Sequence, residues 1–157
     1  MITMEEFKNK KILITGGAKG LGFAFVESFA QLCSEVIFID KEKAEGKKIE
    51  KYFRNKKKKV FFYYSDLSKF QESIKIFKKI LKKHRNIDFL INNARSGQRY
   101  EILKETERNW IRSIDVILKN SFFFSQEFIK QNIYKKTPRC ILNISSIITK
   151  TISKQSE

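Results

Sequence analysis

The amino-acid sequence predicts an α/β protein built around a parallel sheet, and two observations support that prediction. Short runs of β-branched and aromatic residues alternate along the chain with longer segments of helical periodicity, which is typical of strand–helix–strand units. Glycines cluster directly after the first apolar run, where such a unit turns from strand into helix. Strands are expected over residues 11–15, 35–39, 60–64, 88–92 and 140–144.

Four helices are expected to connect these strands. The start of the third is marked by Ser68 and Gln71, whose spacing fits a capping box. Thr106 can cap the fourth, which is the longest. Apolar residues recur along one face of the third helix, namely Phe70, Ile74, Phe77 and Leu81. The four helices are expected over residues 21–33, 41–54, 68 to about 81, and 106 to about 131.

Length and composition exclude several classes of protein. The 157 residues correspond to one domain, expected over residues 1–157, and a hydrophobic fraction of 41% supplies a core that a disordered chain lacks. No apolar run approaches the roughly 20 residues of a membrane-spanning helix, and the N-terminus lacks the pattern of a secretory signal. Cys33 and Cys140 are far apart and show no metal-ligand spacing. We therefore expect reduced, buried thiols in a cytoplasmic protein.

The chain is strongly basic, with 33 Lys+Arg against 17 Asp+Glu and a net charge of +16. Such a surplus suggests a nucleic-acid partner, because basic patches supply most non-specific affinity for phosphate backbones. Much of the charge lies in residues 41–59 and 78–85, in the pattern of a solvated helix face. The aromatic residues 61–64 could stack on bases, but such residues are ordinary in a buried strand. We favour a solvent-exposed lysine-rich surface over a nucleic-acid site.

The segment from Thr15 to Gly22 carries the clearest chemical signal. Glycines between a strand and a helix allow a tight turn and the close approach of a pyrophosphate. The phosphates then meet free N–H groups and the positive end of the helix dipole. Gly16, Gly20 and Gly22 have a Gly-x-x-x-Gly-x-Gly spacing, wider than the usual dinucleotide fingerprint. The loop predicts a phosphate cradle.

Asp40 lies at the end of the second expected strand, 18 residues after Gly22. An acidic side chain at this place can accept hydrogen bonds from both ribose hydroxyls of NAD, and the alternative is a helix N-cap. A 2′-phosphate would meet the carboxylate at about 4 Å, which costs up to roughly 4 kcal/mol at an effective dielectric constant near 20. Lys19 and Lys41 would offset part of that cost. We expect NAD to be preferred over NADP.

Five short motifs follow one another along the chain and carry a family resemblance. The glycine loop is followed by Asp66-Leu67, Asn92-Asn93-Ala94, Trp110 at the start of the long helix and Asn143-Ile-Ser-Ser146. In this order they resemble the short-chain dehydrogenase/reductase family, whose members oxidise alcohols or reduce carbonyls with a nicotinamide dinucleotide. The resemblance covers residues 11 to about 146.

The resemblance implies a Rossmann-like, doubly wound parallel sheet, truncated after the fifth strand. It gives Asp66 an adenine contact, and no metal site is expected because the sequence shows no metal-ligand spacing. Arg95 stands where the family motif has Gly, which adds a cation near the cofactor cleft. The cofactor-binding residues expected on these grounds are Gly16, Lys19, Gly20, Leu21, Gly22, Asp40, Asp66, Leu67, Asn92 and Ala94.

Only one of the family's four catalytic groups is expected in this chain. The resemblance makes Ser146 the residue that holds the substrate carbonyl or hydroxyl, and Ile117 stands where the relay Asn is expected. The family's Tyr-x-x-x-Lys pair is expected roughly a dozen or more residues past Ser146, where only residues 147–157 remain and none is Tyr. Two earlier matches, Tyr52 to Lys56 and Tyr100 to Lys104, precede Ser146 and are not expected to serve.

These observations predict an NAD-binding domain of an alcohol or carbonyl oxidoreductase that is nearly inactive by itself. General acid–base groups contribute about 10² to 10⁴ in rate, so their loss would leave hydride transfer close to silent. The alternative is a non-catalytic nucleotide-binding or interaction subunit. Because the fifth strand would be an open sheet edge, we expect a homo-oligomer or a complementing chain to cover it.

Overall fold

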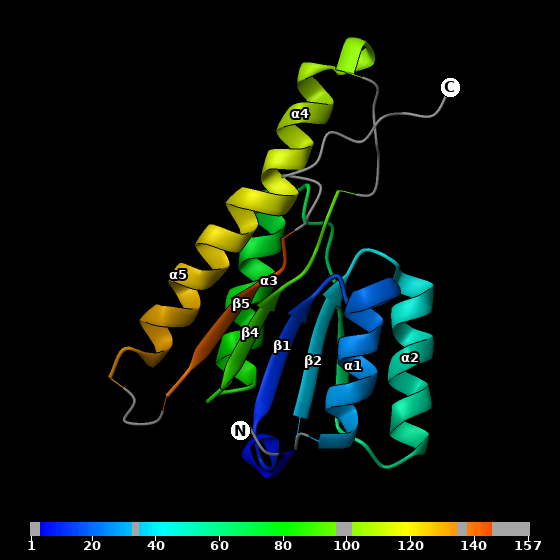
Figure 1. The fold of residues 1–157 in the computed structure, drawn as a ribbon, viewed down its shortest axis with the longest axis vertical. Coiled ribbons are helices and arrows are strands. Elements are labelled where there is room, and N and C mark those ends of the chain that lie inside the picture. Colours follow the sequence, from blue (N-terminus) through cyan, green and yellow to red (C-terminus); the bar gives the residue numbers. More distant parts are fainter. Residues whose placement is uncertain (1–3, 33–34, 97–101, 135–137, 146–157) are drawn as a thin grey trace.

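The structure is a computed structural model, and it describes residues 4–32, 35–96, 102–134 and 138–145. These residues form one five-stranded parallel sheet in the order β3-β2-β1-β4-β5 (Figure 1), with helices on both faces. This confirms the Rossmann-like fold class expected from the sequence. The strands are β1 (Lys11–Thr15), β2 (Glu35–Asp40), β3 (Val60–Tyr64), β4 (Phe89–Asn92) and β5 (Cys140–Asn143).

The strands are in register, so their carboxyl ends meet at one edge of the sheet. Ile14 of β1 lies opposite Phe38 of β2 and Ile91 of β4. Farther out, Asp40 pairs with Tyr64, and Asn92 pairs with Asn143. Polar residues that follow or end different strands are therefore brought within reach of one another at this carboxyl edge.

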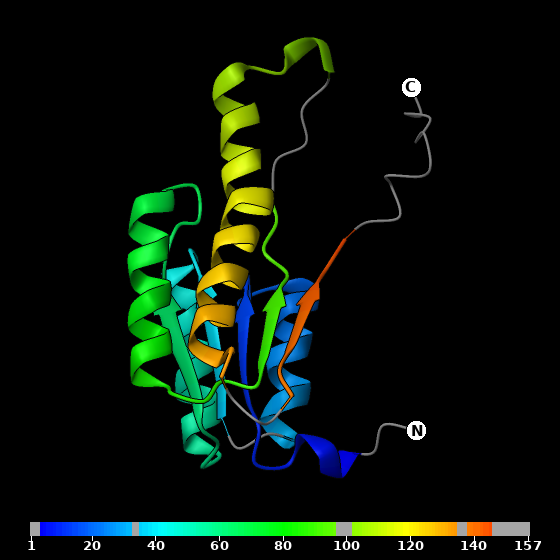
Figure 2. The ribbon, with the colours of Figure 1, turned by 90° about the vertical axis from the view of Figure 1, so that its left-hand side faces the viewer.

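Helices cover both faces of the sheet, as Figure 2 shows. On one face lie α1 and α2, and on the other lie α3 and α5. The helices are α1 (Gly20–Leu32), α2 (Lys43–Asn55), α3 (Phe70–Lys83), α4 (Glu107–Ile114) and α5 (Asn120–Asn132), with short 3-10 turns at Met4–Phe7 and Ile102–Lys104.

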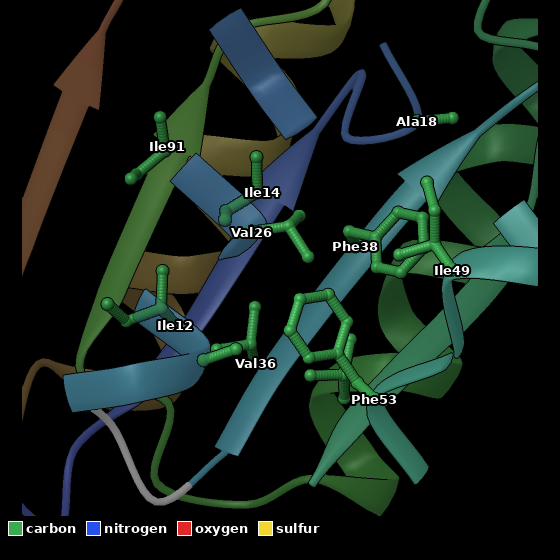
Figure 3. Close-up of a cluster of buried hydrophobic side chains, with 11 residues drawn as sticks. Ile12, Ile14, Ala18, Val26, Val36, Phe38, Ile49, Phe53 and Ile91 are labelled. Atoms are coloured by element: carbon green, nitrogen blue, oxygen red, sulfur yellow. The ribbon is translucent and has the colours of Figure 1, made fainter. Parts of the chain in front are cut away.

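Side chains of successive strand residues alternate between two apolar clusters, one on each face of the sheet. Figure 3 shows the first cluster, in which Ile12 and Ile14 of β1 face Val26 of α1, and Phe38 of β2 faces Phe53 of α2. In the second cluster, the intervening residues of the same strands pack against α3 and α5. In it the rings of Phe77 and Phe124 stack with centroids 4.0 Å apart. Burial on both faces is what a parallel sheet requires.

The long helix expected near residues 106–131 exists, but it has an interruption. The Thr106 side chain accepts a hydrogen bond from the Asn109 N–H, which confirms the predicted cap. Between α4 and α5 the chain makes a π-helical segment, Asp115–Lys119, which the sequence pattern does not reveal.

The capping box expected at Ser68 and Gln71 is wrong. Helix α3 begins at Phe70 with Lys69 at the N-cap position and no side-chain cap. The Ser68 hydroxyl instead donates to Asp66 Oδ1 at 2.8 Å. The same Asp66 oxygen accepts the Ser68 N–H, which a capping box would need for the Gln71 side chain. Because a carboxylate is a strong acceptor, Ser68 belongs to the preceding turn.

The expectation of buried thiols is also wrong where it can be examined. Cys140, the first residue of β5, is exposed, whereas Cys33 lies outside the described residues. The exposure follows from the position of β5 at the edge of the sheet, where Leu142 is also 45% exposed. Among the described residues, no helix is long and apolar enough to cross a membrane.

Candidate nucleotide-binding site

The loop between β1 and α1 lies at the carboxyl edge of the sheet, and the chain is packed too closely here for side chains at Gly16, Gly17 and Gly22. Gly16 has φ +71°, and a Cβ built there would lie 2.9 Å from the Ala94 Cα. A Cβ on Gly22 would lie 1.9 Å from the Gly16 carbonyl oxygen, closer than any real contact. The loop therefore folds back on the first turn of α1 only because these positions have no side chain.

The open side of this loop is formed by three of the five residues between Gly16 and Gly22. Lys19, Gly20 and Leu21 are all exposed, and Gly20, with φ +55°, has no atom within 4 Å of its missing Cβ. Helix α1 begins at Gly20, so the N–H groups of its first turn have no acceptor within the helix. This is the arrangement of an anion-binding helix terminus.

Asn93 fastens the glycine loop to the end of β4, a role that sequence reasoning missed. Its Nδ2 donates to the carbonyl oxygens of Thr15 at 3.0 Å and Gly16 at 3.1 Å. The Thr15 hydroxyl in turn accepts the N–H groups of Asn93 and Ala94, at 3.0 and 3.1 Å. The signal was present as the second Asn of the Asn92-Asn93-Ala94 motif. These bonds fix Ala94 beneath the loop.

Asp40 is held by two backbone N–H groups. Its Oδ2 accepts from Ala18 at 2.9 Å, and its Oδ1 accepts from Glu42 at 3.0 Å. The N-cap position of α2 is Glu42, so the alternative of Asp40 as a helix cap is not what the structure shows. Each carboxylate oxygen has a further lone-pair position, so the group can still accept hydroxyl donors. The side chain links the glycine loop to the end of β2.

The turn after β3 places Asp66 and Leu67 at the same edge. Asp66 Oδ1 accepts from the Ser68 N–H at 3.0 Å, while the Leu67 side chain is buried in the core. Burial by itself would raise the pKa of Asp66, but hydrogen bonds from Ser68 and the positive charges of Arg112 and Lys41 outweigh it and hold the pKa below its usual range. The carboxylate is ionised at neutral pH and can act as an acceptor.

Asn92 closes the central part of the edge. It is 5% exposed, and its Nδ2 donates to Asn143 Oδ1 at 2.8 Å and to Ser125 Oγ at 3.2 Å. Its own Oδ1 is buried and has no hydrogen-bond donor among the described residues. A buried amide oxygen without a partner is costly, so this atom is a candidate contact for a ligand.

The predicted catalytic residue cannot be placed, because Ser146 lies outside the described residues, three positions after the end of β5. Ile117, at the position expected for the relay Asn, lies in the π-helical segment and is 49% exposed. Tyr52 lies in the second half of α2, which starts at the carboxyl edge and runs away from it. The Lys56 ammonium group donates a hydrogen bond to the Tyr52 hydroxyl at that end of the helix, so the Tyr52–Lys56 pair is remote from the site.

No group of three or more metal-ligating side chains occurs in the described parts of the chain. The groups at the carboxyl edge are backbone N–H donors at a helix terminus, two carboxylates and an unpaired amide oxygen. These groups fit a nicotinamide dinucleotide, which has phosphates, hydroxyls and an adenine to be bound. The fold and the arrangement of this edge are those of the Rossmann class of proteins.

Comparison with known proteins identifies the family. The sequence profile of the family described as short chain dehydrogenase matches residues 10–156, which is nearly the whole chain. This protein therefore belongs to the short chain dehydrogenase family of oxidoreductases, as its motifs led us to expect.

Relatives differ in the reactions that their names state. The chain is 26% identical over 140 residues to the D-xylose 1-dehydrogenase of Caulobacter vibrioides, covering 89% of this chain and 54% of that protein. It is 30% identical over 141 residues to the 3-oxoacyl-(acyl-carrier-protein) reductase FabG of Thermotoga maritima, covering 90% and 57%. The chain thus spans about half the length of the curated relatives it matches.

Solved structures confirm the fold. A short-chain dehydrogenase from Sphingobium yanoikuyae in complex with NADPH superposes with a TM-score of 0.80 at 21% sequence identity. The match covers 88% of this chain and 54% of that one. At this level of identity the likeness extends to the fold, and the cofactor of that protein is its own.

Proposed function

We propose that this chain binds a nicotinamide dinucleotide across the carboxyl edge of its sheet, as the nucleotide-binding part of an alcohol or carbonyl oxidoreductase of the cytoplasm. The observation that carries the proposal is the joint between the glycine loop and β2. The same Asp40 carboxylate that would accept the ribose hydroxyls also accepts the Ala18 N–H of the loop that would hold the phosphates. Phosphate and ribose sites are thereby fixed relative to each other.

The roles proposed for the individual residues follow from their positions. Gly16 and Gly22 allow the loop to close on the first turn of α1, and on its open side the N–H groups of Lys19, Gly20 and Leu21 would bind the pyrophosphate. The remaining contacts lie along the neighbouring strand ends. Asp66 and Leu67 would bind the adenine, and Asn92 and Ala94 would border the nicotinamide half.

A preference for NAD over NADP is part of the proposal. A 2′-phosphate on the ribose would approach the Asp40 carboxylate, at a cost of up to roughly 4 kcal/mol at an effective dielectric constant near 20. Lys19 is the nearest cation of the loop, but its Nζ lies 3.2 Å from Glu42 Oε2. Its charge is therefore partly neutralised and offsets less of the repulsion than a free lysine would.

Hydride transfer by this chain alone is proposed to be nearly absent. The nicotinamide ring would supply the site at which a hydride is gained or lost, and the chain must then move a proton at the substrate oxygen. Of the groups for that step only Ser146 is present, while Ile117 can hold neither a proton nor a water. Oxidation of NADH at an ordinary enzymatic rate by the purified chain with a carbonyl substrate would overturn this part.

Calorimetric titration of NADH and then NADPH into the purified full chain tests the proposal, with circular dichroism to establish folding. The expected result is binding of NADH and weaker binding of NADPH. Asp40→Ala should weaken the binding of NADH by about 10- to 100-fold, because hydrogen bonds to a charged group are lost. The difference in affinity between NADH and NADPH should become smaller. Glu72→Ala, a change of an exposed carboxylate on α3, is the matched control. Absence of binding by a folded chain would overturn the proposal.

A second function is favoured by the exposed edge of β5. Beside that strand lies a groove of about 170 Å³ between the end of α5 and β5, lined by Phe128, Ile129, Ile133 and Ile141 together with Asn132 and Arg139. We propose as the alternative a non-catalytic subunit whose open edge receives a second copy or a complementing chain. A stable, stoichiometric complex recovered from cells would favour this function, and a monodisperse monomer would count against it.

A further inference from the structure

A buried polar cluster joins the long helix to the turn after β3. Asn120, the first residue of α5, is 1% exposed. Its Nδ2 donates to the Leu67 carbonyl oxygen at 2.6 Å and also to the carbonyl oxygen of Asp115. Its Oδ1 lies 2.5 Å from the hydroxyl of Ser73, a fully buried residue of α3. The whole amide group of Asn120 is therefore bound by three different segments.

The π-helical segment sets the position of this side chain. The backbone N–H of Asn120 bonds to the carbonyl oxygen of Asp115, five residues earlier. Such a wide turn rotates the residues that follow by about 100° relative to a continuous α-helix, which is one residue step. Asn120 begins α5 directly after this turn, with its side chain against α3. Isolated π-turns in helices occur frequently at functional sites.

Asn120 controls the turn that carries Asp66. Leu67 is fixed twice, because its side chain is buried in the core and its carbonyl oxygen accepts from Asn120. Asp66 precedes it directly, and its Oδ1 is held by the N–H and hydroxyl of Ser68. A displacement of the Leu67 backbone, to which Asp66 is directly joined, would break the hydrogen bond from Asn120. The long helix also acts on this carboxylate through the charge of Arg112.

We propose that Asn120 is a positioning residue for the adenine end of the bound dinucleotide, acting through Leu67 on Asp66. This inference rests on the function proposed above and extends it to a residue that touches no ligand. It implies that affinity for the adenine half depends on Asn120, whereas affinity for the nicotinamide half does not.

The test compares, in the full chain, a ligand that carries the adenine with one that lacks it. ADP-ribose and nicotinamide mononucleotide are titrated separately into the wild type, Asn120→Ala and Ile49→Ala. The Ile49 change removes a buried side chain of α2 on the opposite face of the sheet, so it controls for lost stability alone. Thermal unfolding by circular dichroism shows how far each variant is destabilised.

Asn120→Ala should weaken ADP-ribose about tenfold, which equals about 1.4 kcal/mol and is the order of one buried hydrogen bond. The affinity for nicotinamide mononucleotide should equal that of the wild type, and Ile49→Ala should leave the affinity for both ligands unchanged. Equal weakening of both ligands by Asn120→Ala, or unchanged ADP-ribose binding, would overturn the inference. Failure of the wild type to bind either ligand would instead overturn the proposed function.

If Asn120→Ala does not fold, Ser73→Ala provides a milder change. It keeps the amide of Asn120 but removes the hydroxyl that fixes its orientation. ADP-ribose affinity should then fall by about threefold, in keeping with the loss of a single neutral hydrogen bond, with nicotinamide mononucleotide unaffected. An unchanged ADP-ribose affinity in this variant would overturn the inference.

Discussion

Gly22 is the residue at which the proposed phosphate site depends most on the absence of a side chain. Its missing Cβ would overlap the carbonyl oxygen of Gly16 and come within 2.6 Å of Asn93 Nδ2. Neither is the free end of a flexible side chain, since the first is backbone and the second is held by two hydrogen bonds. Room for a Cβ could come only from moving the loop.

Gly22→Ala is therefore expected to lower the free energy of unfolding by about 2 kcal/mol or more, as overpacked cores do, and to abolish NADH binding. Gly20→Ala is the matched control, because its Cβ would meet open space and only its φ of +55° is unfavourable. That variant should lose about 1 kcal/mol, the cost of the left-handed region for Ala. Denaturant unfolding of both variants measures the difference, and equal losses would contradict the packing argument.

Glu35 makes the stability of the protein sensitive to acid. Burial by itself would raise the pKa of Glu35, but the hydrogen bond and charge of His84 and the charge of Lys11 hold it below its usual range. His84 is buried and also bonds the Tyr63 hydroxyl at 2.7 Å. A carboxylate whose pKa is lowered on folding contributes stability that is present above its unfolded pKa and is lost as pH falls through the folded value.

Glu35→Gln should therefore flatten the fall in stability of the protein below about pH 4.5, the ordinary value for Glu. At neutral pH the variant should lose about 1 kcal/mol, because a charge-assisted hydrogen bond becomes a neutral one. Urea unfolding at a series of pH values measures both effects. Identical slopes for variant and wild type in the acid range would show that Glu35 is not coupled to folding.

At the scale of the elements, the strands were predictable and the details of the helix ends were not. The apolar runs that form β1 and β2 were located from residue type alone, because a strand covered on both faces must be largely apolar. The start of α3 was misplaced because the side chains of Asp66 and Gln71 can both accept a hydrogen bond from Ser68. A local pattern does not show that the bond is made to Asp66. The outcome depends on where the Asp66 carboxylate lies in the fold.

The same limit applies to the site. That Gly16, Asp40 and Asp66 share one edge of the sheet could be predicted because each ends or follows a strand in the sequence, and parallel strands end together. Asn93 and Asn120 could not be assigned their contacts, since those partners are more than 45 residues away in the chain. Their roles depend on how β1, β4, α3 and α5 pack.

The hydrogen bonds of the Thr15 hydroxyl link the end of β1 to the residues after β4, and substitution of Thr15 measures their contribution to stability. Thr15→Val keeps the shape of the side chain but leaves the N–H groups of Asn93 and Ala94 without their acceptor. The expected loss is about 1–3 kcal/mol in the free energy of unfolding. Thr15→Ser retains the hydroxyl and should recover most of that loss. Chemical denaturation of both variants is the measurement, and a Val variant as stable as the wild type would show that the Thr15 hydroxyl does not contribute to the link.

At the scale of the whole molecule, two opposing features govern association. The open side of β5 exposes Leu142, and the groove beside it is mostly apolar, so this edge favours contact with another chain. The net charge of +16 opposes contact between two copies, because like charges repel over distances set by the ionic strength. Self-association through the edge should therefore become stronger as salt is added. Binding to a nucleic acid would show the reverse dependence.

Leu142→Lys should reduce this self-association, because a lysine on an edge strand places a charge where an apolar contact would form. Leu103→Lys is the matched control, since Leu103 is 95% exposed in the 3-10 turn before α4 and adds the same charge away from β5. Sedimentation velocity at micromolar concentrations and two ionic strengths measures the association of all three proteins. Both variants carry the same net charge, so a larger effect at Leu142 can come only from its position. Equal effects would mean that charge alone controls association, and a wild type that stays monomeric in high salt would remove the edge of β5 as the contact.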